Sequence, residues 1–263
     1  MIGLIFGETN FPKVILNYFK KTKKKYLIID LTKNKIFKTN KNSYSVTIGQ
    51  IGKIISILKK RNCKKVIFAG RVKKPNFSKL KLDLKGIYYL PRIIKASKLG
   101  DAAILKELIK ILNENKIKVI KSNFFNPELT LSKGNFSKKR PDKLDNASII
   151  KGVKTLNHLN AHNHIQGLIV KDNIIIKKES SKGTKKMILS LNKTKNSGGI
   201  LIKFPKKKQD LRVDLPTIGL DTLKDCKKRN LKGIVLKANK NIFLDKNKCK
   251  NFANKNKIFI TIL

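Results

Sequence analysis

Short apolar runs alternate with amphipathic segments through the first half of the chain, and this rhythm restricts the fold more than any other feature of the sequence. The runs of strand length are residues 2–6, 26–31, 66–69 and 118–121. The segments with apolar side chains at helical spacing are residues 11–20, 51–60 and 102–113. Strands that alternate with helices form a parallel sheet with helices on both faces. We therefore expect a Rossmann-like α/β arrangement in this half.

The alternation lapses between Pro127 and Pro141, where the sequence becomes polar and carries a glycine, as linkers between domains do. A second set of elements follows. Its predicted helices are residues 147–159, 185–191 and 220–228, and its predicted strands are residues 167–170, 174–178, 200–204, 233–236, 242–244 and 258–262. We expect two α/β domains, a Rossmann-like N-terminal domain with a parallel sheet over residues 1–131 and a C-terminal domain over 141–263, joined by a linker over 132–140.

The chain is strongly basic, since 62 lysines and arginines stand against 16 acids and leave a net charge of +46. Such a balance favours anionic partners: nucleic acid, an anionic membrane or phosphorylated ligands. Only six of the basic residues are arginine, and the lysines come with abundant asparagine and isoleucine, whose AT-rich codons would produce the same profile through codon bias. Because arginine makes the bidentate contacts of nucleic-acid readers and the lysines form no tail or stripe, we expect no nucleic-acid partner. A basic nucleic-acid-binding protein remains an alternative.

Cysteine and histidine are scarce in this chain. Cys63, Cys226 and Cys249 form no CxxC pair, which indicates a reducing compartment without disulfides. The three histidines fall within residues 158–164, but no cysteine or acid accompanies them at ligand spacing, so they do not predict a zinc site. No apolar run approaches the length of a membrane span, and the N-terminus lacks a charged leader. We expect a cytoplasmic protein.

Two glycines follow predicted strands of the first half. Gly7 lies in a turn that resembles the phosphate-binding turn between a strand and a helix. The dinucleotide motif is incomplete and Asp30 is only loosely placed for a ribose contact, so a dinucleotide-dependent dehydrogenase or a nucleotide-sugar transferase remains an alternative. Gly70 and Arg71 follow the run 66–69, and the carboxyl ends of strands bind the ligands of open α/β sheets. A guanidinium there suits a diphosphate, so we expect Gly7, Gly70 and Arg71 to line a ligand cleft.

Aspartates gather around the start of the predicted helix 220–228. Asp210, Asp214, Asp221 and Asp225 are four of the 16 acids of the chain. A carboxylate near a helix N-terminus and several cations can hold Mg²⁺ and a pyrophosphate together. We expect Asp214 to be the centre of the site. The alternative is that Asp214 caps a turn and Asp221 caps the helix.

Several motifs occur in one order along the chain. They are Gly-Leu-Ile-x-Gly at residues 3–7 with Pro12, Ile-Gly-Gln-Ile-Gly-Lys at 48–53, Phe-Ala-Gly-x-Val at 68–72 with Pro75, Leu90-Pro91, Gly100-Asp101, Gln166, Glu179 with Gly183-Thr184, and Gln-Asp-Leu-Arg-Val-Asp-Leu-Pro-Thr-Ile-Gly at 209–219. In these motifs the chain resembles the UDP-2,3-diacylglucosamine pyrophosphatases of lipid A assembly, of the two-domain type that is unrelated to the metallophosphoesterases. The motif at 209–219 is the most specific. At 182–187 the chain has Lys-Gly-Thr-Lys-Lys-Met where the family commonly has Glu-Gly-Thr-Asp-Ala-Met.

The resemblance implies a hydrolase that cleaves UDP-2,3-diacylglucosamine to UMP and 2,3-diacylglucosamine 1-phosphate (lipid X), with Mg²⁺ or a similar divalent cation as cofactor. It also implies a substrate cleft between the two domains, a homodimer and an essential Asp214. By the same resemblance, Gln166, Gly183 and Thr184 bind substrate. Part of the positive surface would help the enzyme meet the anionic inner membrane, where its lipid substrate resides.

Hydrolysis of a pyrophosphate needs phosphates whose charge is neutralised and a water that is oriented for attack. We expect Asp214 to bind the metal or to orient the attacking water, because a carboxylate beside a cation is a weak base. Lys203 and Arg212 would offset phosphate charge. Gln209 and Thr217 would hydrogen-bond the substrate.

Overall fold

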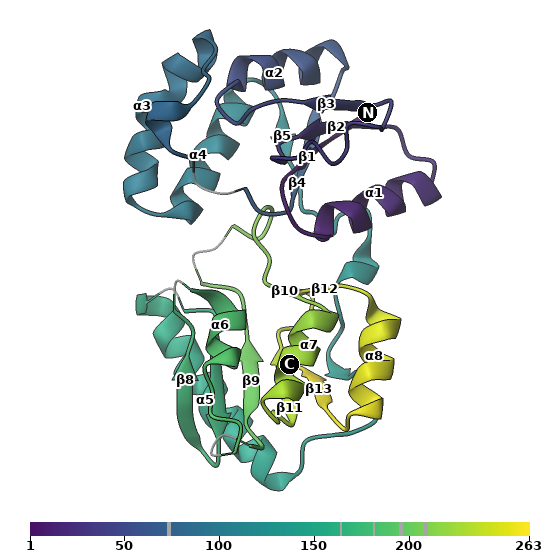
Figure 1. The fold of residues 1–263 in the computed structure, drawn as a ribbon, viewed down its shortest axis with the longest axis vertical. Helices are drawn as coiled ribbons and strands as arrows, with labels where there is room; N and C mark the ends of the chain where they lie inside the picture. The colour runs from purple at the N-terminus through teal and green to yellow at the C-terminus, as the bar shows by residue number, and fades with distance from the viewer. Residues whose placement is uncertain (73–74, 164, 181, 195–196, 208–209) are drawn as a thin grey trace. The chain divides into compact units, whose positions relative to one another are not determined.

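Figure 1 shows the fold in a computed structural model, which describes residues 1–263 apart from 73–74, 164, 181, 195–196 and 208–209. The chain divides into two compact units. The first comprises Met1–Asn126 and Arg212–Asp214, and the second comprises Pro127–Leu211 and Leu215–Leu263. Each unit has its own sheet with helices packed on it, which confirms the predicted α/β class.

The first unit is built on a five-stranded parallel sheet with the strand order β3-β2-β1-β4-β5. Its strands are β1 (Ile2–Phe6), β2 (Tyr26–Asp30), β3 (Ser43–Ser45), β4 (Lys65–Ala69) and β5 (Lys118–Val119). The strand order reverses between β1 and β4, and ligands of open α/β sheets bind outside the carboxyl ends of strands at such a reversal. Gly7 follows β1 and Gly70 follows β4, so both lie at this point.

The helices of the first unit are α1 (Phe11–Lys21), α2 (Ile51–Lys60), α3 (Leu84–Lys98) and α4 (Asp101–Glu114), with a 3₁₀ turn η1 (Phe77–Lys79). The predicted apolar spacing is confirmed in α1, which buries Ile15 and Phe19, and in α2, which buries Ile54, Ile55 and Leu58. Right-handed crossovers in opposite directions place α1 and α2 on opposite faces of the sheet (Figure 1). The sequence did not predict α3.

The second unit is built on a six-stranded mixed sheet with the order β6-β13-β11-β9-β7-β8. Its strands are β6 (Gly134–Asn135), β7 (Gly167–Lys171), β8 (Ile174–Lys178), β9 (Ile200–Lys203), β11 (Gly233–Leu236) and β13 (Phe259–Ile262). Strands β9, β11 and β13 are parallel, whereas β6, β7 and β8 run antiparallel to the strands beside them. A separate parallel pair joins β10 (Thr217–Ile218) to β12 (Ile242–Phe243).

The predicted hairpin between β7 and β8 is confirmed. Its turn residues Asp172 and Asn173 have φ values of 47° and 61°, the left-handed conformation that these two residue types tolerate best after glycine. Strand β7 also runs antiparallel to β9, with Gly167 in register with Lys203. The start of β7 therefore lies beside the end of β9.

The helices of the second unit are α5 (Lys143–Asn163), α6 (Gly183–Leu189), α7 (Leu220–Lys228) and α8 (Lys246–Lys255), with a 3₁₀ turn η2 (Pro127–Leu129). Helix α5 covers one face of the sheet, where Ile149 and Leu156 join a buried cluster with Leu168 and Val170 of β7. On the opposite face Ile169 of β7 belongs to a cluster with side chains of α6, α7 and α8. Alternate residues of one strand thus supply both apolar layers.

No helix in the part of the chain that the structure describes combines the length and the apolar composition needed to span a bilayer.

Candidate active site

Gly7, Gly70 and Arg71 come together at the reversal point of the first sheet. The backbones of Glu8 and Arg71 pair through two hydrogen bonds, each 2.8 Å from nitrogen to oxygen. Gly70 has a φ of +88°, and a Cβ on it would stand 2.4 Å from the carbonyl oxygen of Glu8. A Cβ on Gly7 would stand 2.6 Å from the carbonyl oxygen of Arg71. Both glycines are therefore needed, because a side chain at either position would prevent the close approach of these two backbone segments. This approach places the exposed Arg71 at the carboxyl ends of β1 and β4.

Asp30, at the end of β2, is used within its own loop. Its Oδ1 accepts hydrogen bonds from the backbone N–H and the hydroxyl of Thr32, at 2.9 and 2.6 Å, and its Oδ2 accepts one from the N–H of Phe37 at 3.0 Å. The side chain is only 1% exposed. A dinucleotide enzyme needs an acid that faces the ribose, so this arrangement weakens the dehydrogenase alternative.

Three of the predicted site residues gather with Glu179 at one end of the sheet of the second unit. Gln166 directly precedes β7, Glu179 directly follows β8, and Lys203 is the last residue of β9. Because β7 runs antiparallel to both β8 and β9, its start lies beside the ends of the other two strands. Thr184 lies in the first turn of α6 at the same place. We call Gln166, Glu179, Thr184 and Lys203 the polar cluster.

Hydrogen bonds connect three members of the polar cluster. The Thr184 hydroxyl donates to Glu179 Oε1 at 2.6 Å and accepts from Lys203 Nζ. Lys203 Nζ lies 3.9 Å from Glu179 Oε1. Lys203 is 6% exposed and Glu179 is 8% exposed, so both charges are buried. Asn241 fixes the backbone beneath them, since its side-chain amide donates to the carbonyl oxygen of Lys203 at 3.2 Å.

Two acceptor oxygens of the polar cluster lack a donor. Glu179 Oε2 and Gln166 Oε1 are buried and have no hydrogen-bond partner among the residues that the structure describes. A Cβ on Gly167 would stand 2.8 Å from Glu179 Oε2, so the glycine makes room for that oxygen. Buried acceptors are nearly always satisfied, because an unmade bond costs free energy. The two oxygens are therefore suited to receive N–H or O–H donors from a ligand.

Within the motif that contains Asp214, residues 212–214 belong to the first unit and residues 215–219 belong to the second. Arg212 lies in a turn and Asp214 directly follows the turn, and both residues are half-buried, whereas Thr217 is exposed at the start of β10. The carbonyl oxygen of Pro216 accepts from Ile242 N–H at 2.9 Å, which anchors the end of the motif to β12. Gln209, which was predicted to bind substrate, lies outside the described residues.

The end of the motif leads into α7, whose N-cap is Gly219. Asp221 is exposed in the first turn of the helix, so the alternative in which it serves as the cap is wrong. Its charge there still interacts favourably with the helix dipole. Gly183, at the start of α6, has a φ of +84° and open space where a Cβ would lie, which leaves its backbone accessible.

Potential metal ligands are dispersed. Within the described part of the chain, no three His, Cys, Asp or Glu side chains form a group that could hold a metal ion. His158 is exposed on α5, while His164 and the side chain of His162 lie outside the described residues. All three cysteines are free and buried. Burial raises the pKa of Cys249 to about 12 and also raises that of Cys226, so these thiols stay protonated.

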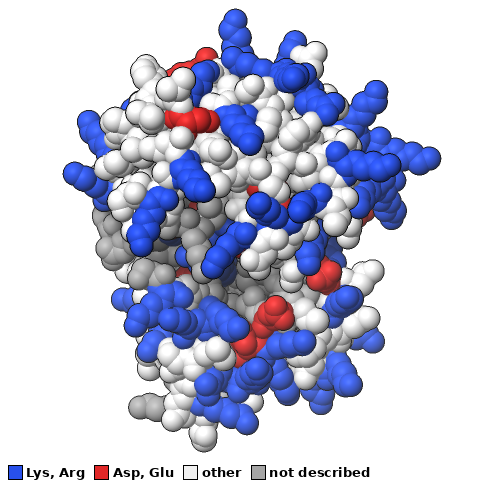
Figure 2. Space-filling model, turned by 45° about the horizontal axis from the view of Figure 1, so that its top comes forward, with Lys and Arg blue, Asp and Glu red and all other residues white. Residues whose placement is uncertain are grey.

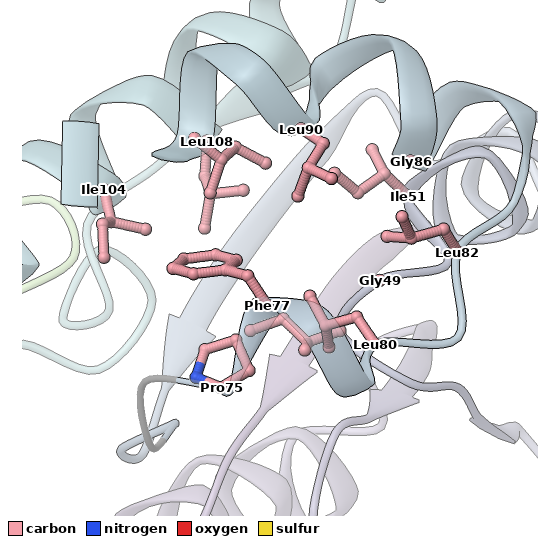
Figure 3. Close-up of a pocket in the computed structure, with 12 residues that line it drawn as sticks. Gly49, Ile51, Pro75, Phe77, Leu80, Leu82, Gly86, Leu90, Ile104 and Leu108 are labelled. Carbon is pink, nitrogen blue, oxygen red and sulfur yellow. The ribbon is translucent and has the colours of Figure 1, made fainter. Parts of the chain in front are cut away.

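The first unit contains an apolar pocket between α3, α4 and the segment that leads to η1 (Figure 3). Ile51 of α2, Phe77 of η1, Leu90 of α3 and Leu108 of α4 are among the residues that line it, and every lining residue is apolar or glycine. Figure 3 shows the Phe77 ring below Leu108, with Leu90 beside it. The pocket has the chemistry for a hydrocarbon chain and offers no group for catalysis.

The family comparison covers both units. The model of the LpxI N-terminal domain matches residues 1–129, and that of the LpxI C-terminal domain matches residues 132–261. The chain belongs to the LpxI family. The resemblance deduced from the motifs is thereby confirmed.

One curated LpxI relative is the UDP-2,3-diacylglucosamine pyrophosphatase LpxI of Caulobacter vibrioides, which is 31% identical over 209 residues, or 76% of this chain and 75% of that protein. Among solved structures, dTDP-glucose 4,6-dehydratase of Bacillus anthracis in complex with NAD matches with a TM-score of 0.28 at 11% identity, covering 55% of this chain and 43% of that one. The last likeness is too low to bear on fold or function.

Of the polar cluster, Gln166 and Thr184 were predicted from the family resemblance and Lys203 from the charge that the reaction must neutralise, whereas Glu179 was not assigned to the site. In the sequence, Glu179 is only part of the family motif that also contains Gly183-Thr184. The signal that would have found it is its position, since it is one of 16 acids in the chain and directly follows a predicted strand. No sequence pattern could have predicted the role of Asn241, because that role depends on its hydrogen bond to the carbonyl oxygen of Lys203, which is distant in the sequence.

Proposed function

We propose that this LpxI family member is a hydrolase of lipid A biosynthesis that cleaves the pyrophosphate of UDP-2,3-diacylglucosamine to UMP and 2,3-diacylglucosamine 1-phosphate. The observation that carries the proposal is the 31% identity to the Caulobacter pyrophosphatase over three quarters of both chains. The Asp-Leu-Pro-Thr motif at residues 214–217 and the polar cluster supply the chemistry that this reaction needs.

In the proposed reaction Asp214 orients the water that attacks a phosphorus atom. The reaction breaks one P–O bond of the diphosphate and forms a P–O bond to the water oxygen, and a water proton is lost to solvent. Arg71, at the reversal point of the first sheet, and Arg212, two residues before Asp214 in the sequence, offset the negative charge of the phosphates. Thr217, exposed at the start of β10, donates a hydrogen bond to the substrate.

The polar cluster is proposed to hold the polar part of the substrate. Glu179 Oε2 and Gln166 Oε1 would accept hydrogen bonds from its hydroxyl or amide groups, which would satisfy the two buried oxygens. Lys203 would donate to its oxygens, and Thr184, whose one hydroxyl proton goes to Glu179, would hold Glu179 and Lys203 in position beside the substrate. The open backbone of Gly183 lets the substrate approach the start of α6. Gln209 is also proposed to bind the substrate, and only its place in the motif at residues 209–219 supports this role.

Mg²⁺ is the proposed cofactor, with Asp214 as its protein ligand. The carboxylate oxygens of Asp214 are the kind of ligand that Mg²⁺ prefers. Mg²⁺ is often held by one or two carboxylates together with waters and substrate phosphates. Such a site needs no cluster of three protein ligands, so the dispersed acids of the described chain fit it. When bound, Mg²⁺ would neutralise charge on the diphosphate.

The acyl chains and the membrane complete the proposal. The apolar pocket of the first unit is suited to one acyl chain. The lysine excess supports peripheral contact with the anionic inner membrane from the cytoplasmic side. A homodimer is proposed from the family resemblance.

The first prediction concerns UMP release. Purified protein should release UMP from UDP-2,3-diacylglucosamine with Mg²⁺, and both EDTA and Asp214→Ala should reduce the rate by at least about a hundredfold. Asp221→Asn, which removes an exposed acid of the same segment, is the matched control and should keep the rate. Absence of UMP release by the wild type, where a known pyrophosphatase works, would reject the function. Tight NAD(P) binding or salt-sensitive retention on nucleic acid would then support the alternatives.

A further inference from the structure

Helix α3 has an outward face that is apolar and open to solvent. Leu84 is 86% exposed, Ile87 is 57% exposed and Tyr88 is 73% exposed. Their spacing of three and four residues places them on one side of the helix. Single exposed hydrophobic residues are ordinary, but neighbouring ones on one helix face indicate a contact surface. We call these three residues the α3 patch.

The opposite face of α3 is apolar as well. Gly86, Leu90 and Ile93 line the apolar pocket beneath the helix. A helix that is apolar on both sides is expected to be covered on both sides. Within the described part of the chain, nothing covers the α3 patch, as its exposure shows.

The surroundings of the α3 patch are basic. Between residues 77 and 99, every lysine is exposed, namely Lys79, Lys81, Lys85, Lys95 and Lys98. The only acid in this stretch of sequence is Asp83, whose carboxylate accepts hydrogen bonds from the N–H groups of Gly52, Lys53 and Gly86. Figure 2 shows the same imbalance more widely, with many blue lysines and arginines and few red acids on the face that it presents.

An apolar helix face bordered by lysines matches the interface of an anionic bilayer, where apolar side chains enter the acyl boundary and ammonium groups meet the headgroup phosphates. We propose that the α3 patch docks the protein onto an anionic membrane and inserts Leu84, Ile87 and Tyr88 into its interface. The choice of a membrane rests on the proposed function, because a diacylated substrate resides in one. The charge favours this partner over a second copy of the chain, whose own lysines would repel.

The experiment is co-sedimentation with vesicles of phosphatidylethanolamine and phosphatidylglycerol. The triple variant Leu84→Ser, Ile87→Ser, Tyr88→Ser should bind at least about tenfold more weakly than the wild type. The matched control carries Leu144→Ser, Ile150→Ser and Ile174→Ser, which remove similarly exposed residues of the second unit, at 75%, 70% and 65%. The control should bind as the wild type does. Vesicles of phosphatidylcholine alone should bind the wild type weakly.

Equal vesicle binding by the triple variant and the wild type would overturn the proposal. So would a change from dimer to monomer in the triple variant with vesicle binding retained, because a second copy would then cover the patch. The single variant Leu84→Ser should show a smaller loss in the same direction, and it provides the test if the triple variant unfolds. UMP release from detergent-dispersed substrate separates the two proposals, since docking can fail while hydrolysis persists and hydrolysis can fail while docking persists.

Discussion

Lys203 and Glu179 bring opposite charges together inside the second unit, with Nζ 3.9 Å from Oε1. Burying two ions costs several kcal/mol each, about as much as their attraction and hydrogen bonds return. Thr184 satisfies Glu179 Oε1, but Oε2 has no donor in the described chain. An incompletely satisfied network is costly in a folded core. The arrangement is therefore better explained as a ligand site than as a device for stability.

The polar cluster allows a prediction at the level of single residues. Lys203→Met removes the cation and leaves Glu179 buried without a counter-charge, so the free energy of unfolding should fall by about 3 kcal/mol. Glu179→Gln in the same chain should restore part of the loss. Urea denaturation measures both effects. Lys177→Met, which changes an exposed lysine of β8, is the control. A loss no larger than in the control would show that the pair is not coupled.

Among the helices, α3 depends most on tertiary contacts. Asp83 is its N-cap, and Asp83 Oδ1 accepts from Gly86 N–H at 2.7 Å. The same carboxylate accepts from the N–H groups of Gly52 and Lys53, at 3.0 and 2.8 Å, in the first turn of α2. One side chain thus caps two helices. This clamp explains how a segment with Pro91 in its interior, which disfavours a helix, still forms one.

The pKa of Asp83 is lowered in the folded protein. Burial raises it, but the hydrogen bonds from the N–H groups of Lys53, Gly86 and Gly52 outweigh the burial. A carboxyl group with a lowered folded pKa stabilises the protein fully above its unfolded pKa of about 3.9. The stabilisation is lost as pH falls through the folded pKa.

The prediction for this element is that Asp83→Asn lowers the free energy of unfolding by about 1–2 kcal/mol near pH 7. The difference in free energy of unfolding between the variant and the wild type should shrink as the pH falls below about 4. Protonation removes the charge of Asp83 in the wild type and so weakens its hydrogen bonds, as the substitution does. Thermal unfolding across this pH range gives the comparison. Asp101→Asn, at an exposed acid in the first turn of α4, is the control. A difference that stays constant with pH would contradict the proposed clamp.

At the scale of the whole molecule, the net charge of +46 is the dominant electrostatic fact. With 62 basic residues and 16 acids, most cations have no acid to pair with, and the surface repels itself. Some pairs do form, such as the fork of Arg92 with Glu107 and Glu114, at 2.6 to 2.9 Å, which joins α3 to α4. Such pairs are exceptions on a basic surface (Figure 2).

Self-repulsion predicts that salt stabilises this protein. Screening at about 0.2 M NaCl reduces the interaction of exposed charges beyond about 8 Å, so Tm should rise by several degrees relative to low salt. Scanning calorimetry over a series of NaCl concentrations measures the effect. Low concentrations of inorganic phosphate serve as the comparison. A rise with phosphate alone and none with NaCl would indicate a specific anion site instead of general repulsion.

Much of the fold and part of the site could be predicted from local sequence patterns. The alternation of apolar runs and helical spacing is set by near neighbours, so the parallel strands β1, β2 and β4 and helices α1 and α2 could be predicted. Helix α3 could not, because its start depends on Asp83 reaching back to α2. Its apolar residues also face both the pocket and solvent, so they form no single stripe.

The sequence by itself determined the α/β class, the motif around Asp214 and the family, because these depend on residue type and spacing along the chain. Only the tertiary structure decided which residues meet. Gly7 and Gly70 lie together because the strand order places β4 beside β1. Gln166 lies near Lys203 because Gly167 and Lys203 are in register. Glu179 Oε2 lacks a hydrogen-bond partner in the described chain because folding removes it from water. Burial results from the packing of the whole chain, so it could not be predicted from local sequence patterns.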